Sequence, residues 1–313
     1  MQKNKTNNIT YGSMMIALFA ILLGLTFYIP FVGFITAFIV LLPIAWYSAN
    51  FERKQAILVT TISIIISFII GNIGGLIFGL LIAPLGFIIG DSIRGNKSKL
   101  YMLMASTIFI LFMTAVQYII SILVLNINVL EQFLENIEIY YERLGNMMSS
   151  VGQLPENYDA MVNKSLQLIE AIMPTYFIGG AFILAFIYLS INLPLLKKLK
   201  LDVPKFSKFV DFRLPKAVLW YYLIVSVITL IVSFEIGTFG YLLFINAALI
   251  LRTLLFLQGV SLIHYYFYVR GWPKWAAILA TFLAVPLYTF TIILGVLDLG
   301  FNLRGFLKDR YKK

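Results

Sequence analysis

The sequence predicts an all-α, polytopic integral membrane protein with about 8–10 transmembrane segments and an extracytoplasmic helical hairpin. Of its 313 residues, 61% are hydrophobic and only 12% are charged. A soluble domain has about 45–50% apolar and about 25% charged residues. The mean hydropathy of +0.92 agrees with this excess. No soluble core would bury so much apolar surface, so we expect the lipid bilayer to be the solvent and partner of the chain.

The apolar residues fall into stretches of about 20, the length that a helix needs to cross a bilayer. Pro30 separates the first two stretches, and the glycine-rich residues 71–75 separate the third from the fourth. The predicted spans are residues 10–29, 31–47, 55–70, 74–90, 100–125, 172–193, 217–234, 239–268 and 275–297.

The positions of lysine and arginine predict the orientation, because these residues concentrate in cytoplasmic loops. With the N-terminus inside, the next cytoplasmic segments are residues 48–54, 91–99 and 194–216, which are rich in basic residues. The opposing segment 126–171 has only Arg143 and Lys164. We therefore expect a multi-pass protein of a bacterial plasma membrane with a cytoplasmic N-terminus, and the net charge of +10 does not indicate nucleic-acid binding.

The last third of the chain allows two topologies. If residues 239–268 form one pass, the basic tail after Asp298 lies outside, against the charge rule. A break near Arg252, giving two short passes or a re-entrant hairpin, places the tail inside. The break is the preferred interpretation, and one long pass is the alternative.

The extracytoplasmic segment 126–171 carries apolar residues at steps of three and four, which indicates an amphipathic helix. Asn128 followed by Glu131 resembles a capping box at its start. Pro155 precedes a second helical stretch, so we expect a helical hairpin of about 40 residues.

Catalytic signatures are nearly absent. The chain has no cysteine and one histidine, His264. A paired-histidine metal site is therefore impossible, and His264 precedes a run of aromatic residues typical of a membrane interface. The glycines at 90 and 95 lack the lysine that a phosphate loop needs directly after the second glycine. We expect no catalytic residues, no metal and no cofactor, and we expect that the protein is not an enzyme.

Polar groups inside spans are costly and therefore indicate functional positions. Arg252 stands out, because a charge at mid-span costs about 2.5–3.5 kcal/mol on insertion scales. Its alternatives are a structural ion pair with Glu235 or a water-facing position at a helix break. The ligand-binding candidates are Asn72, Gln117, Asn246, Arg252 and Gln258.

Small residues four apart let helix backbones approach closely in lipid. One ridge follows the fourth span, and two pairs lie on the first span. Packing within the chain is the preferred interpretation of the ridge, and a cavity lining is the alternative. The pairs predict contact with a helix of this chain or of a partner subunit. These packing or docking residues are Ser13, Ala17, Ala20, Gly24, Gly71, Gly75 and Gly79.

The run from Tyr11 to Ala20, with Pro43 and the run from Ala83 to Asp91, resembles the S components of energy-coupling factor transporters. The whole chain, including Leu294–Asp298, Phe301 and Arg304, is similar to the YybS-like family of bacterial membrane proteins. The S-component resemblance implies a six-helix unit that binds a small molecule and docks onto a membrane subunit.

Three parts follow from these patterns. Residues 1–195 form the S-component-like unit with the insertion at 126–171, residues 196–216 a basic cytoplasmic loop, and residues 217–313 a C-terminal membrane module. The leading hypothesis is a substrate-binding or transport-related protein, with a pocket lined by Asn72 and Gln117 under the hairpin. The alternative is a scaffold or signalling partner that acts through the hairpin and the basic loop.

Overall fold

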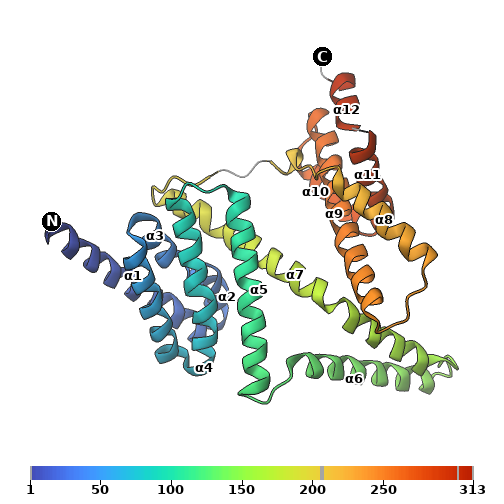
Figure 1. Cartoon of the computed structure of the whole chain (residues 1–313), viewed down its shortest axis with the longest axis horizontal. Coiled ribbons are helices and arrows are strands. Elements are labelled where there is room, and N and C mark those ends of the chain that lie inside the picture. Colours follow the sequence, from blue (N-terminus) through green and yellow to red (C-terminus); the bar gives the residue numbers. More distant parts are fainter. Residues whose placement is uncertain (1, 205–207, 302, 312–313) are drawn as a thin grey trace. The chain divides into compact units, whose positions relative to one another are not determined.

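The computed structural model describes residues 2–204, 208–301 and 303–311, and within these ranges all regular structure is helical. Lys205, Lys312 and Lys313, which belong to the predicted basic loop and tail, lie outside the described residues. The chain divides into two compact units, residues 1–133 with 177–205 and residues 134–176 with 206–313 (Figure 1). The predicted all-α, polytopic membrane class is confirmed, with six helices long and apolar enough to cross a bilayer in the described part.

The first unit, here called the N-terminal unit, contains the predicted first five spans and the end of the sixth. Its helices are α1 (Gln2–Tyr28), α2 (Pro30–Ile39), α3 (Leu42–Asn50), α4 (Arg53–Arg94), α5 (Lys99–Leu123) and the second part of α7 (Tyr158–Lys198). Its core is apolar and centred on Phe19, Leu41, Ile82 and Leu189, all fully buried. Serine, threonine and asparagine side chains are also buried in this unit, and the buried Asn192 amide donates to the Phe38 carbonyl at 2.8 Å.

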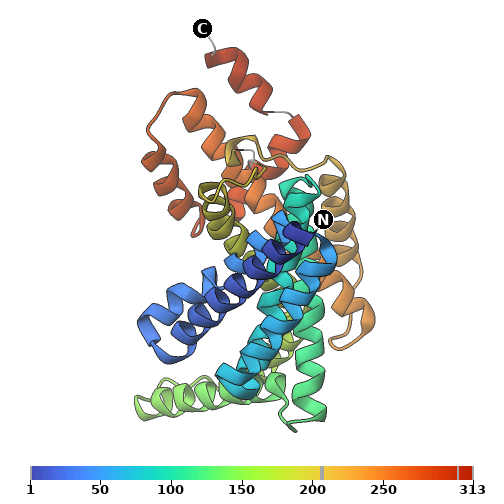
Figure 2. The same cartoon turned by 90° about the vertical axis from the view of Figure 1, so that its left-hand side faces the viewer.

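Helix α4 is a hairpin of two spans. Gly71 and Asn72 leave the helical conformation, with φ of −118° and 51°, and the chain doubles back there (Figures 1 and 2). A Cβ on Gly75 would lie 2.1 Å from the Ser67 carbonyl oxygen. At the far ends, the Arg53 and Asp91 side chains pair at 2.9 Å. The predicted separation of two spans at residues 71–75 is therefore confirmed.

The second unit, here called the C-terminal unit, begins within α6 (Val129–Ser150). It continues with the first part of α7, the 3-10 turn η1 (Phe209–Asp211) and the helices α8 (Ala217–Ile231), α9 (Phe239–Val269), α10 (Lys274–Ala284), α11 (Tyr288–Phe301) and α12 (Leu303–Tyr311). Helices α6 and α7 form a helical hairpin, whose extracytoplasmic position stays a prediction. The Tyr158 hydroxyl donates to the Tyr141 carbonyl at 2.7 Å, and the Tyr158 ring fills the space that Gly145 leaves.

The predicted break near Arg252 is wrong. Helix α9 runs unbroken from Phe239 to Val269, and Arg252 lies on an exposed face of it. The break occurs instead within the predicted span 275–297, where α10 and α11 are bent by 115° at a break of no more than four residues. Pro286 lies at this bend and cannot supply the backbone N–H that a continuous helix needs.

Helix α11 crosses α9 with the two backbones in contact. A Cβ on Gly259 would lie 2.0 Å from the Thr291 carbonyl oxygen, and a Cβ on Gly295 would lie 2.1 Å from the Leu255 carbonyl oxygen. Only glycine permits this approach, which is the way that small residues bring helices together in lipid. The crossing sets Asp298, near the end of α11, beside the second half of α9.

Candidate functional site

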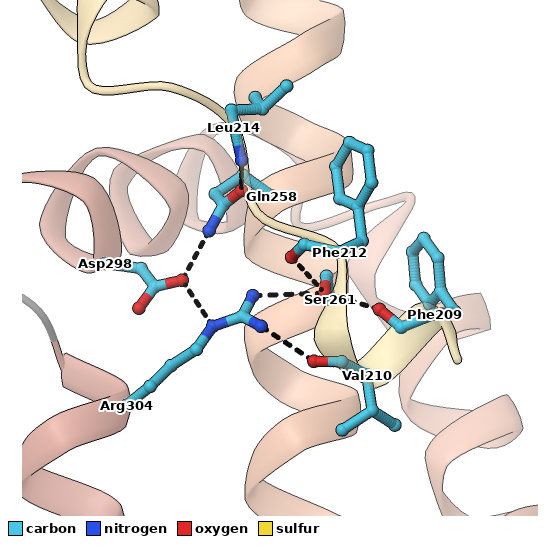
Figure 3. A network of polar contacts seen from close by, with 8 residues as sticks. All are labelled: Phe209, Val210, Phe212, Leu214, Gln258, Ser261, Asp298 and Arg304. Carbon is cyan, nitrogen blue, oxygen red and sulfur yellow. Dashed lines mark hydrogen bonds and ion pairs between the residues drawn. The ribbon is translucent and has the colours of Figure 1, made fainter. Parts of the chain in front are cut away.

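A network of polar side chains is buried where α9, α11, α12 and the segment 209–214 meet (Figure 3). Asp298 is fully buried, and Arg304 is 7% exposed. The Arg304 Nε lies 2.9 Å from Asp298 Oδ2, and Gln258 Nε2 donates to the same oxygen at 2.5 Å. We call Gln258, Ser261, Asp298 and Arg304 the Arg304 network.

The network also binds the loop that precedes α8. The other two Arg304 nitrogens donate to the Val210 carbonyl at 2.7 Å and to Ser261 Oγ at 3.1 Å. The Ser261 hydroxyl lies 2.7 Å from the Phe209 carbonyl oxygen. The Leu214 N–H donates to Gln258 Oε1 at 2.9 Å. One guanidinium thus joins α11, α9 and the loop.

The Asp298 carboxylate is only half satisfied. Its Oδ2 accepts from Arg304 and Gln258, whereas its buried Oδ1 has no hydrogen-bond partner in the described structure. Removing a charge from water costs several kcal/mol unless the charge is paired and its lone pairs are satisfied. The Oδ1 atom therefore marks a place where a cation or a rearranged donor gains free energy by binding.

A hollow of about 360 Å³ lies against the Arg304 side chain. Its remaining lining is basic, with Asp211 as the acidic exception, and consists of Val210, Asp211, Arg213, Tyr265, Gly305 and Lys308. The Arg304 guanidinium lies over the Tyr265 ring, 5.4 Å from its centroid. The hollow is a largely open depression rather than an enclosed cavity.

Comparison with known proteins places the chain in a family. Residues 17–299 match the family described as "Predicted membrane protein (DUF2232)". The chain belongs to this family. It is also 29% identical over 311 residues to the "Uncharacterized protein YybS" of Bacillus subtilis (strain 168), covering 97% of this chain and 99% of that protein. No solved structure matches the chain.

The predicted likeness to the YybS-like family is thus confirmed, and the likeness to S components stays a prediction. The family match includes Gln258, Ser261 and Asp298 and ends before Arg304.

Of the five predicted ligand-binding residues, only Gln258 belongs to the Arg304 network. Asn246 instead joins α9 to α7 within the C-terminal unit, since its Oδ1 accepts from the Thr175 hydroxyl at 2.6 Å and its Nδ2 donates to the Ala171 carbonyl at 2.6 Å. Arg252 is exposed, and the predicted pair with Glu235 is absent from the ion pairs of the described residues.

Neither Asn72 nor Gln117 lines the hollow beside Arg304 or the hollow described in the N-terminal unit. Asn72 is exposed at the break in α4. The Gln117 amide donates to the Ile77 carbonyl at 2.9 Å, which ties α5 to the second half of α4. A hollow of about 140 Å³ is described in the N-terminal unit, away from both residues. It is lined by Lys99, Leu193, Pro194, Lys197, Val203 and Pro204. His264 lies in the C-terminal unit, with Nε2 2.7 Å from the Thr281 hydroxyl.

The predicted packing residues divide into two groups. The ridge of Gly71, Gly75 and Gly79 faces neighbouring helices, since Cβ atoms there would meet Phe27 or Ser67. The residues on α1 differ, because Ser13 and Ala17 are exposed, Ala20 and Gly24 are half-buried, and a Cβ on Gly24 would meet nothing within 4 Å.

Ser261, Asp298 and Arg304 are site residues that were not among the predicted ligand-binding residues, although Asp298 and Arg304 belong to the run that resembles the YybS-like family. Asp298 and Arg304 lie six residues apart at the end of an apolar stretch, where charges are usually interfacial. The sequence feature that could have indicated this site is Asp298 itself, an acidic residue directly after the glycine-containing run that ends the last predicted span.

Proposed function

We propose that this protein is a substrate-binding, transport-related protein of the bacterial plasma membrane, not an enzyme, and that its ligand engages the Arg304 network. The supporting observation is the fully buried Asp298, which has one oxygen without a donor among the described residues and is held by an arginine that lines a hollow. Buried ionisable groups in membrane proteins mark substrate or ion pathways. The pocket is therefore assigned to the C-terminal unit rather than to Asn72 and Gln117.

The Arg304 network connects elements that a competing ligand can separate. Its guanidinium joins α11 to the loop 209–214, so a ligand that competes for Arg304 loosens both connections. A cation at the Asp298 oxygen that has no partner in the described structure weakens the same ion pair from the other side. A ligand shifts a conformational equilibrium only by its difference in affinity for the two states. Competition for Arg304 supplies that difference.

The proposed topology has the N-terminus and the C-terminus in the cytoplasm. Helix α9 is a single pass, and α10 with α11 is a re-entrant hairpin. The two helices are bent by 115° relative to each other, so they do not form one straight span. The contacts of α9 with α10, α11 and α12 described above all lie between Leu255 and Tyr265.

In this topology the basic tail is cytoplasmic, as the charge rule requires, and no break at Arg252 is needed. The loop after α9 and the tail both become cytoplasmic. Of the 24 lysines and arginines, all except Arg143, Lys164 and Arg252 then lie on the cytoplasmic side. In this arrangement the Arg304 network lies towards the cytoplasmic face, and the hairpin of α6 and α7 is extracytoplasmic. The exposed Ser13–Ala17 face of α1 is available to a membrane partner subunit.

Native mass spectrometry of the gently solubilised full chain tests the proposal. We expect a co-purified small molecule on the wild-type protein. It should be lost from the double variant Asp298→Asn/Arg304→Gln, which removes both charges, and retained by Arg310→Gln, which changes an exposed arginine of the same helix. A wild-type protein without a bound small molecule, or a double variant that retains it, contradicts the assignment.

A second candidate function is a scaffold that acts through the α6–α7 hairpin. The observation that favours it is the row of exposed carboxylates on α6 at Glu131, Glu135, Glu138 and Glu142, which leaves a charged face open to a partner. A co-purified protein that is lost when these glutamates are changed to glutamine supports this candidate and not the first.

A further inference from the structure

We propose that the hollow beside Arg304 binds a phosphate-class anion, either a lipid phosphodiester headgroup or a soluble phosphate compound. This inference rests on the proposed function and names the ligand class of the same site. Three basic side chains surround the hollow, from Arg213, Arg304 and Lys308. Two carboxylates act on them, Asp211 in the lining and Asp298 behind Arg304. A positive charge remains in excess.

The arrangement of the basic side chains suits an oxyanion, whose oxygen atoms accept directed hydrogen bonds, better than a negative charge without such acceptors. The Arg304 guanidinium is fixed by its Asp298, Val210 and Ser261 contacts and by the Tyr265 ring beneath it. A fixed, planar guanidinium presents its remaining N–H groups in the fork that phosphate oxygens fit. Lys308 follows Arg304 by four residues on α12, so the two side chains share one helix face.

The lining of the hollow suits an anion that carries several oxygens. The Tyr265 ring that underlies Arg304 also lines the hollow, so its hydroxyl is a further donor group beside the basic side chains. Arg213 comes from the loop, Tyr265 from α9 and Lys308 from α12. Donors from three elements thus surround one volume, whereas a single carboxylate from Asp211 opposes binding.

The hollow also adjoins an aromatic run, since Tyr265 is part of its lining. Helix α9 ends in the aromatic run Tyr265–Tyr268, and such aromatic belts occupy the membrane–water interface. Cations gather on these rings, with Lys208 Nζ 5.4 Å from the Tyr268 centroid and the Arg270 guanidinium 5.1 Å from the Tyr266 centroid. Basic pockets between helices on the cytoplasmic side bind anionic headgroups.

Two measurements on the full chain separate the sources. Inorganic phosphate is titrated against the detergent-solubilised protein while its thermal unfolding is followed. Vesicles of phosphatidylcholine with or without phosphatidylglycerol are used to load the protein before native mass spectrometry. Lys308→Gln should weaken binding about tenfold, the loss of one charge-assisted hydrogen bond. Asp211→Asn should strengthen it, and Arg310→Gln, outside the lining, should leave it unchanged.

Stabilisation by phosphate that follows this order of variants supports a soluble phosphate compound. Retention of phosphatidylglycerol alone, in the same order, supports a lipid headgroup. If neither probe binds, or if Lys308→Gln and Arg213→Gln both bind like the wild type, the hollow is not a phosphate-class site. A co-purified ligand that still requires Arg304 but is displaced by neither probe would refute this inference while the proposed function stands.

Discussion

Replacing Arg304 by glutamine should be the most damaging single change in the C-terminal unit. The substitution leaves Asp298 buried, charged and without its cation, and breaking a buried pair in this way costs about 3–5 kcal/mol. It also removes the donor to the Val210 carbonyl. Asp298→Asn should cost less, because the amide oxygen still accepts from Arg304 and Gln258 and no buried anion remains.

The double variant Asp298→Asn/Arg304→Gln should recover a large part of the loss. Directly coupled residues show interaction energies of about 0.5–3 kcal/mol in a double-mutant cycle, and a fully buried ion pair should lie at the top of that range. Equilibrium unfolding in mixed detergent measures all four proteins. Additivity within about 0.5 kcal/mol would refute the claim that the two charges depend on each other.

Other positions give sharper contrasts. Gly259→Leu should cost about 3 kcal/mol or more by overpacking and lower the yield of folded protein. The control Gly180→Leu places its side chain in open space and should not lower the yield. Equal yields of the two variants would mean that α9 and α11 do not cross as described. Arg252→Gln should change the unfolding free energy by less than about 0.5 kcal/mol, and a large loss would indicate a buried partner. Tyr158→Phe should cost about 1 kcal/mol through the lost bond to Tyr141, measured by the same unfolding assay, and an unchanged value would argue against the hairpin contact.

Composition and periodicity predicted the membrane class, the break in α4 and the helical hairpin from the sequence. Each of these depends on local signals, such as the glycine-rich residues 71–75 or the step of apolar residues along α6. The capping interaction at α6 was equally local, and the Asn128 side-chain oxygen accepts from the Glu131 N–H at 3.3 Å.

The end of the chain was predicted less well because two local signals competed. The basic tail suggested a break near Arg252, since one long pass would place the tail outside against the charge rule, but α9 is continuous and exposes Arg252 on one face. The weaker signal, Pro286 within a span of ordinary length, marks the actual bend. Sequence spacing could not reveal which residue would balance Asp298, because the Arg304 network depends on the crossing of α9 and α11.

The side of the membrane on which α12 lies tests the account most directly. Single cysteines at Gln153, Lys198 and Arg310, introduced into a chain that has none, can be treated with an impermeant thiol reagent in intact cells. The account predicts labelling at position 153 only, with 198 and 310 labelled after the cells are opened. Labelling at 310 in intact cells, with 198 protected, would place the tail and the loop 209–214 on opposite sides and contradict the Arg304 network.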